Sequence, residues 1–393
     1  MKSQPKIKDE EYLLLELCRL EFNNEQLSRI KSLVAVISDW NYFRDLANEH
    51  GVPALVWHNL ETYQLTSAIP EEICSFLKGT LLRSLSRNAF NSEIMSTVLR
   101  LLNNENIKTV ILKGLALENS VYGNSGLRQM SDVDILIKRE ECLKARKVLM
   151  NDGFESLPLK SFFHKYIMAY AGKHLPSLIK NGTSVEIHHE LFGGTPNLLT
   201  KMLYNSSYVI KIKGEQAWLP RPQIFFLYLI RHLHVHEMNN ESQLRLYTDL
   251  IVLLEKHGDE IINDNLLKYA SEAGMTDIFA RYLGILRDIW ETEFPQWLND
   301  FIDRKNNRDF INRFFFFLGS PKGNPPSDRP NSYRHIISEI PGLHRKVLFV
   351  LGDLFPYISF MKERYSCKST LKVLIYYPHR LGKLFWLFKR GRM

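Results

Sequence analysis

The sequence predicts an α+β fold, in which a small mixed sheet with helices is flanked by N- and C-terminal helical segments. Two observations predict it. Apolar residues recur every three or four positions over long stretches in both halves of the chain, which is the period of an amphipathic helix. Between these stretches, the pattern changes to short, β-branched runs of alternating polarity, which are typical of strands. The chain therefore divides into an N-terminal helical region (1–104), an α/β core (105–195), a second helical region (196–318), a linker or loop (319–333) and a basic, aromatic C-terminal helical region (334–393).

The N-terminal region is expected to be helical over residues 9–104. Trp40 opens a helix that Gly51 ends, because glycine is favoured just beyond the last helical turn. Pro70 suits the start of the next helix, and the glutamates that follow it complement the helix dipole. Apolar positions spaced three or four apart predict that this helix continues to about Leu102.

The core is expected to alternate strands and helices. Its expected elements are a strand at 107–112, a helix at 114–122, a strand at 132–137, a helix at 139–151 and two strands at 175–180 and 183–188. Asn181-Gly182 separates the last two strands, and this dipeptide is the strongest short signal for a hairpin.

Residues 196–318 are expected to return to helices, with the clearest periodicity at 224–238 and 244–257. The stretch from Gly319 to Pro330 contains four prolines and two glycines, so it is expected to be a linker or a surface loop. The segment that follows is expected to be helical in pieces broken at Pro356 and Pro378.

The charge is unevenly distributed. Residues 361–393 hold nine Lys/Arg and one Glu, whereas the remaining residues hold 42 of each sign. The net charge of +8 therefore belongs to the C-terminal segment and does not indicate that the whole protein binds nucleic acid. The four cysteines are far apart, and the chain has no signal-peptide or membrane-spanning pattern, so we expect reduced thiols in a cytoplasmic protein.

The C-terminal basic and aromatic segment allows three interpretations. A helix that packs its apolar face on the body and leaves its lysines in water is the plainest. Such a segment can also lie peripherally on an anionic membrane surface, here the inner one, or contact a nucleic-acid backbone.

Candidate catalytic residues gather in the predicted core. Asp132 and Asp134 point to one face of their strand, because side chains at i and i+2 share a face. Glu186 offers a third carboxylate from another strand, with apolar residues on either side of it. Crowded carboxylates repel unless a cation lies between them, and hard divalent cations prefer such oxygen ligands. The alternative is a pair of solvated aspartates at a strand start.

Basic residues accompany these carboxylates. Lys113-Gly114 lies where the first strand turns into a helix, a place at which backbone N–H groups and a lysine can hold phosphate. Arg128 precedes the acidic strand and could meet a phosphate through two hydrogen bonds.

Several other polar residues have both a functional and a structural interpretation. His188 shares the face of Glu186 and could touch substrate or metal, although a structural role is favoured. His232 and His236 can converge on one helix face, but without a third ligand a structural or substrate-lining role is favoured over zinc. Arg245 and Asp249 are four residues apart and could pair on their helix, or complete the substrate side of a cleft.

These residues resemble the DNA polymerase beta-like nucleotidyltransferase superfamily, and most of all its uncharacterised bacterial branch, often called nucleotidyltransferase family 5. The resemblance rests on the Lys-Gly turn, the Arg-x-x-x-Asp-x-Asp strand and the Glu-x-His strand, and it is densest over residues 105–192. It extends more weakly to the helices at 222–257. Gly114-Leu115 stands where the superfamily usually has Gly-Gly or Gly-Ser.

The resemblance implies a metal-dependent transferase that moves a nucleoside monophosphate, with AMP from ATP as the expected group, to a hydroxyl of a small molecule, sugar, protein or RNA end. It implies that Mg²⁺ or Mn²⁺ is held by Asp132, Asp134 and Glu186, and that Glu186 either ligates the metal or acts as base. It also implies contacts to the triphosphate from Lys113, Gly114, Arg128, His188 and Arg245. The alternative functions are a catalytically diverged nucleotide-binding module and a protein associated with membrane or nucleic acid.

Overall fold

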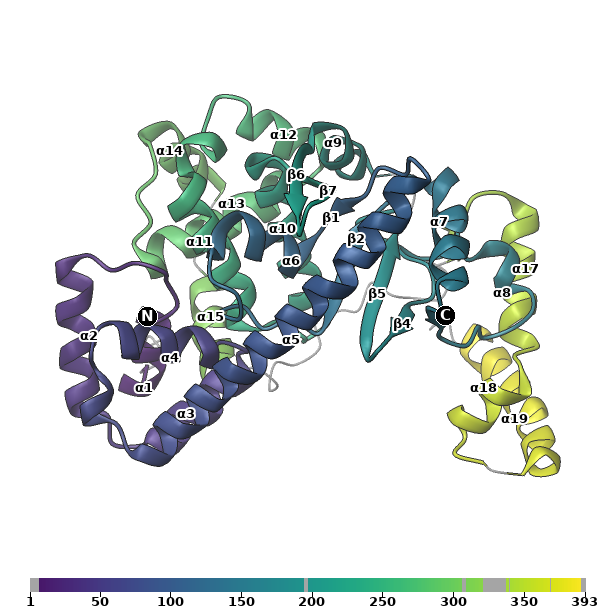
Figure 1. Cartoon of the computed structure of the whole chain (residues 1–393), viewed down its shortest axis with the longest axis horizontal. Helices are drawn as coiled ribbons and strands as arrows, with labels where there is room; N and C mark the ends of the chain where they lie inside the picture. The colour runs from purple at the N-terminus through teal and green to yellow at the C-terminus, as the bar shows by residue number, and fades with distance from the viewer. Residues whose placement is uncertain are drawn as a thin grey trace.

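The expected α+β fold is confirmed by the computed structural model, which describes residues 7–193, 197–305, 309–320, 337–338, 340–367 and 369–389. A seven-stranded mixed sheet lies at the centre, and helices surround it (Figure 1). The strand order is β3-β4-β5-β2-β1-β7-β6. The strands are β1 (Val110–Ile111), β2 (Asp132–Leu136), β3 (Glu155–Ser156), β4 (Leu178–Lys180), β5 (Thr183–His188), β6 (Tyr208–Ile212) and β7 (Glu215–Leu219).

The direction of each strand determines which residues of neighbouring strands lie side by side. β2 runs parallel to β5, and β1 runs parallel to β7, while the other pairs are antiparallel. The hairpin expected at Asn181-Gly182 is present: Lys180 pairs with Thr183, and both turn residues have positive φ angles, as a tight two-residue turn requires.

The helices before the sheet form one end of the molecule, and the last of them is a long helix that crosses the sheet. They are α1 (Asp9–Glu16), α2 (Asn24–Val36), α3 (Trp40–Glu49), α4 (Pro53–Thr62), the 3₁₀ turn η1 (Thr66–Ala68) and α5 (Glu71–Asn104). Asp39 caps α3 by accepting a hydrogen bond from the Tyr42 amide, and Gly51 follows its end with φ +71°. The 34-residue α5 crosses the sheet and contacts β2, β5 and β7 (Figure 1).

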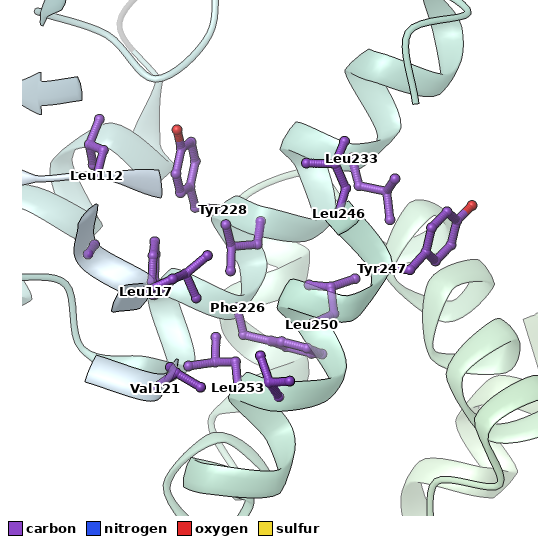
Figure 2. Close-up of a cluster of buried hydrophobic side chains, with 14 of the residues drawn as sticks. Leu112, Leu117, Val121, Phe226, Tyr228, Leu233, Leu246, Tyr247, Leu250 and Leu253 are labelled. Atoms are coloured by element: carbon purple, nitrogen blue, oxygen red, sulfur yellow. The ribbon is translucent and has the colours of Figure 1, made fainter. Parts of the chain in front are cut away.

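Helices within and after the sheet complete the fold. They are α6 (Lys113–Leu117), the π-helical turn η2 (Glu118–Tyr122), α7 (Arg139–Asn151), α8 (His164–Ile167), α9 (Leu198–Ser206), α10 (Pro222–Met238), α11 (Leu244–Ile261), α12 (Leu266–Glu272), α13 (Thr276–Trp290), α14 (Gln296–Lys305), α15 (Asp309–Gly319), α17 (Leu343–Leu354), α18 (Ile358–Arg364) and α19 (Thr370–Lys389). The α10–α11 pair packs beside α6 and η2, and Figure 2 shows the buried side chains of this junction, including Leu117, Val121, Phe226 and Leu250.

Two expectations were wrong in detail. Residues 208–219 were expected to be helical but form the β6–β7 hairpin, which extends the sheet beyond the predicted core. The sequence signal for this hairpin is the glycine of Lys213-Gly214. In the structure both residues have positive φ angles, and the chain reverses there. Pro378 was expected to break a helix but lies inside α19, whereas the break at Pro356 is present between α17 and α18.

Three further expectations concern the predicted linker, the cysteines and membrane-spanning helices. Gly319 ends α15, and residues 321–336, which include most of the predicted linker, lie outside the described residues. All four cysteines are free thiols, as expected. Across the residues that the structure describes, we find no helix that combines the length and the apolar character needed to cross a membrane.

Candidate active site

The acidic side chains come together because β2 and β5 are parallel neighbours. In their register Asp134 lies opposite Glu186, so the two side chains project from the same face of the sheet. Asp132 lies two residues earlier on that face, and His188 two residues after Glu186. Oxygen atoms of Asp134 and Glu186 and a ring nitrogen of His188 lie within 4.8 Å of one another.

Lys113 reaches the centre of this group from the turn between β1 and α6. Its φ of +46° is in the left-handed region, an uncommon conformation for a residue with a side chain, at a cost of about 1 kcal/mol or more. Its Nζ donates to Asp134 Oδ1 at 2.6 Å, and His188 Nε2 lies 2.8 Å from the same oxygen. A strained backbone at Lys113 therefore holds its ammonium group against the buried Asp134 carboxylate.

The ionisation of the carboxylates follows from these contacts. Burial alone would raise the Asp134 pKa, but the Lys113 ammonium and the His188 hydrogen bond hold it well below its usual range. The hydrogen bond from His188 also lowers the pKa of Glu186. Asp132 accepts a hydrogen bond from the Ser131 hydroxyl, but burial, and then the charge of Asp134, raise its pKa. Negative charge at Asp132 is thus the least compensated in the group.

This donor set fits a divalent metal ion. Two ligands of one ion bound at about 2.0–2.2 Å cannot lie more than about 4.4 Å apart, so the spacing of Asp134, Glu186 and His188 needs only small adjustments. Carboxylate oxygens suit Mg²⁺ and Mn²⁺. The Nδ1 atom of His188 is buried without a hydrogen-bond partner among the described residues, whereas its Nε2 lies against both Asp134 and Glu186. Residues that could hold the metal are therefore Asp132, Asp134, Glu186 and His188.

A cleft of about 160 Å³ opens beside this group. Its lining mixes basic, acidic and histidine side chains, and it includes Lys113, Gly114, Arg128, Met130, Asp132, Asp134, His232, His236, Glu241 and Arg245. Small-molecule sites usually have about 300–1,000 Å³, so this cleft has room for a phosphate-sized group rather than a whole nucleotide. Gly114 keeps it open: a Cβ there would lie 2.5 Å from Arg128 and 2.6 Å from Met130.

Arg128 is held in a buried pair. Its Nε and a terminal nitrogen donate to the two carboxylate oxygens of Asp249, each at 2.8 Å, and Tyr122 donates to the same carboxylate. The sequence suggested that Asp249 pairs with Arg245 on its own helix, and this interpretation was wrong. The pairing instead connects the loop before β2 to α11, with Arg128 at the edge of the cleft.

Arg245 lies in the same lining but makes other contacts. It donates to the backbone oxygen of Gln129 at 2.7 Å and to Gln243 at 2.9 Å. Burial, and then the charge of Arg128, lower the pKa of Arg245 to about 10, so it still carries its charge at neutral pH. The two arginines give this side of the cleft a positive potential.

His232 and His236 form the remaining wall, with their ring centres 4.4 Å apart. Burial, and then neighbouring lysines, lower the pKa of His236 to about 4 and the pKa of His232 well below its ordinary value, so both rings are neutral at pH 7. Among the described residues, a cluster of three potential metal ligands occurs only at Asp134, Glu186 and His188, and the wall histidines are not part of it.

Two residues beside the carboxylates, Lys173 and His174, were not predicted from the sequence. Lys173 lies close enough to be acted on by the charges of Lys113, Asp134 and Glu186, and burial followed by Lys113 lowers its pKa. His174 pairs through its backbone with His188, and its ring lies 3.8 Å from Glu186. Both follow Gly172 in an irregular segment where no periodic pattern or short motif marks them.

Comparisons with known proteins identify a family. Residues 38–291, which include every candidate site residue named above, match a family model described as an uncharacterised nucleotidyltransferase. No curated protein matches the chain. Among solved structures, it is similar to an antigenic nucleotidyltransferase-like protein from Paracoccidioides brasiliensis, with a TM-score of 0.32 and 13% identity over 56% of this chain and 95% of that one.

Proposed function

This chain belongs to the family of uncharacterised nucleotidyltransferases, and from that premise we propose that it transfers a nucleoside monophosphate, AMP from ATP, to a hydroxyl acceptor with the help of Mg²⁺ or Mn²⁺. The observation that carries the proposal is the gathering of Asp134, Glu186 and His188 within 4.8 Å, with Asp132 on the same face and Lys113 in contact.

In the proposed reaction, the acceptor oxygen attacks the α-phosphorus, the bond to pyrophosphate breaks, and the acceptor proton passes to a base. A divalent ion held by the carboxylates would neutralise triphosphate charge and lower the pKa of the acceptor hydroxyl. Glu186 is ionised and 19% exposed, so it is available either as a ligand or as the base for that proton. Most of the catalysis would be positioning and charge neutralisation.

Basic side chains around the cleft would bind the phosphates. Lys113 is 14% exposed and faces the cleft, so its ammonium can turn from Asp134 to a phosphate oxygen. Arg128, which lies beside Gly114, and Arg245 also line the cleft and contribute positive potential. The volume of the cleft supports binding of the phosphate end there, with sugar and base lying outside it.

Membership of the DNA polymerase beta-like superfamily is part of the same proposal. It is supported by two aspartates at i and i+2 on one strand, with the third carboxylate on the parallel neighbour. Gly114-Leu115 supplies no hydroxyl at the turn, so the phosphate contacts expected from a serine would come from Lys113 and its neighbours.

The test is transfer from α-labelled nucleotides with Mg²⁺ or Mn²⁺ in cell extract, with labelled product as the readout. We expect Asp134→Asn to reduce transfer at least about a hundredfold, because the isosteric amide cannot neutralise a cation. The matched control is Asp277→Asn at an exposed acid, which should transfer normally.

Circular dichroism must show that Asp134→Asn is folded for the comparison to count. Undiminished transfer by the folded variant would exclude this mechanism. Metal-dependent binding of ATP without product on any acceptor would instead identify the alternative, a diverged nucleotide-binding module.

A further inference from the structure

The C-terminal helices form a separate end of the molecule, opposite α1–α3 (Figure 1). α17 packs on α8, and α18 packs on α19. The anchor is Asp353, 3% exposed, which pairs with Lys160 and lies 3.8 Å from His164. The Tyr357 amide donates to the Lys160 backbone oxygen at 2.8 Å. These contacts fix the C-terminal unit on the segment between β3 and α8.

α19 has a buried face that packs on this unit. Val373 is fully buried, the Tyr377 hydroxyl donates to the Pro356 backbone oxygen at 2.7 Å, and Arg380 Nε donates to the Asp353 backbone oxygen at 3.0 Å. Residues 373, 377 and 380 are spaced four and three apart, so they lie on one side of the helix. The opposite side must therefore point away from the protein.

That outward face of α19 is apolar. It carries Leu371, Leu374, Ile375 and Leu381, which are 79%, 50%, 72% and 39% exposed. At 100° per residue, Leu371, Leu374 and Ile375 lie on the side of the helix that faces away from Val373, and Leu381 lies at the edge of that side. A helix with a packed side and an apolar outward side buries that outward side against something else, because solvated helix faces are normally polar.

Charge narrows the choice of partner. Residues 361–393 carry a net charge of +8, and exposed Lys372 and Arg364 belong to the described part of this segment. A second copy of the chain would bring two such positive segments together, which opposes self-association. Nucleic acid would satisfy the charge but not the aliphatic stripe, since its backbone is contacted by basic and polar groups.

We propose that the outward face of α19 binds the surface of an anionic lipid bilayer, with the helix in the plane of the interface. Its aliphatic side chains enter the boundary between headgroups and acyl chains, and the basic residues of the segment pair with lipid phosphates. The proposal stands independently of the transferase function, because no residue of the candidate active site takes part.

The test is co-sedimentation of the full chain with vesicles of phosphatidylcholine alone or mixed with phosphatidylglycerol. We expect binding to the mixed vesicles only, weakened by added salt. The double variant Leu374→Glu with Ile375→Glu should bind at least about tenfold more weakly, because charge replaces the inserted side chains.

The matched control carries the same charge change elsewhere: Val36→Glu with Leu82→Glu, at residues 59% and 55% exposed on α2 and α5. It should bind the mixed vesicles at least about ten times more tightly than the α19 double variant does. Equal binding by the two double variants, or no binding of the unaltered chain, would overturn the proposal. A dimer in sedimentation velocity that the α19 variant abolishes would also overturn it, and would assign the face to self-association.

Discussion

At the scale of single residues, Lys173 differs from the other basic residues of the site because its largely buried ammonium group has no bonding partner among the described residues. Within the described part of the chain its Nζ has no hydrogen bond or ion pair, while Lys113 beside it is engaged with Asp134. Burial and the neighbouring lysine both disfavour its charged form. An anion bound beside the ammonium would favour its charged form and so offset both effects. A phosphate of the nucleotide is therefore the ligand that we expect Lys173 to bind.

We therefore predict that Lys173→Ala reduces kcat/KM for the nucleoside triphosphate about 10- to 100-fold, the equivalent of one charge-assisted hydrogen bond. Most of the change should appear in KM if the contact forms in the bound state. Lys173→Arg should recover part of the activity. Lys201→Ala removes an exposed lysine on α9 and is the control. Unaltered kinetics for Lys173→Ala would leave this lysine without a role in binding.

The positions of the acidic residues could be predicted from sequence, and that of Lys173 could not. Side chains alternate along any strand, so two aspartates at i and i+2 must share a face wherever the strand lies. Glu186 needed one further fact, the parallel register of β5 with β2, which its apolar neighbours do not give, because they fix only the face of their own strand. Lys173 lies in an irregular segment whose path depends on the whole sheet, so no local pattern locates it.

At the scale of elements, the Arg128–Asp249 pair connects the loop before β2 to α11. Arg128 is 7% and Asp249 1% exposed, and their two hydrogen bonds form in the interior. The pair therefore positions the strand that carries Asp132 and Asp134 against the helix that carries Arg245. Its partners are 121 residues apart in sequence, and helix spacing favoured the wrong partner for Asp249.

We predict that Asp249→Ala lowers the free energy of unfolding by about 3–5 kcal/mol, because it leaves the Arg128 charge buried without its carboxylate. The double variant Arg128→Met with Asp249→Leu should be less destabilised, since it removes both charges. Asp303→Ala, at an exposed pair with Arg287, should cost less than about 1 kcal/mol. Urea denaturation measures all three, and a similar loss for Asp249→Ala and Asp303→Ala would contradict a buried pair.

Elements whose signal is local were predictable. α5, α7 and the β4–β5 hairpin follow from period and from turn residues that any chain would need there. The β6–β7 hairpin was missed because a five-residue strand between helices gives little periodicity, and Lys213 is a less obvious turn residue than Asn181. Pro378 stays in α19 because packing of Val373 and Tyr377 offsets the hydrogen bond that proline removes.

At the scale of the whole molecule, a buried histidine joins three helical elements far apart in sequence. His50, at the end of α3, accepts a hydrogen bond on Nδ1 from the Leu244 amide at the start of α11. Its Nε2 donates to the backbone oxygen of Leu318 in α15 at 2.8 Å. The bond from Leu244 needs the neutral ring, because a protonated Nδ1 cannot accept, and burial lowers the pKa of His50 to about 4.

This arrangement predicts a loss of stability in acid. The ring is neutral in the folded protein down to about pH 4, whereas in the unfolded chain it takes up a proton near pH 6.5. Between these values the unfolded state binds more protons, so stability falls as pH decreases from about 6.5 to about 4. The full contribution of His50 is about 3 kcal/mol, and the buried His232, whose pKa burial also lowers, acts in the same direction.

Comparing His50→Gln with the unaltered chain isolates this contribution, because glutamine can still donate to Leu318 but does not titrate. We expect the variant to be less stable at pH 7 by about 1 kcal/mol, yet to lose less stability than the unaltered chain on going to pH 4. Urea denaturation at several pH values, followed by tryptophan fluorescence, gives both quantities. His379→Gln at an exposed ring is the control for a histidine outside the core. If His50→Gln and the unaltered chain lose the same stability over this range, the joint between α3, α11 and α15 does not depend on a neutral His50.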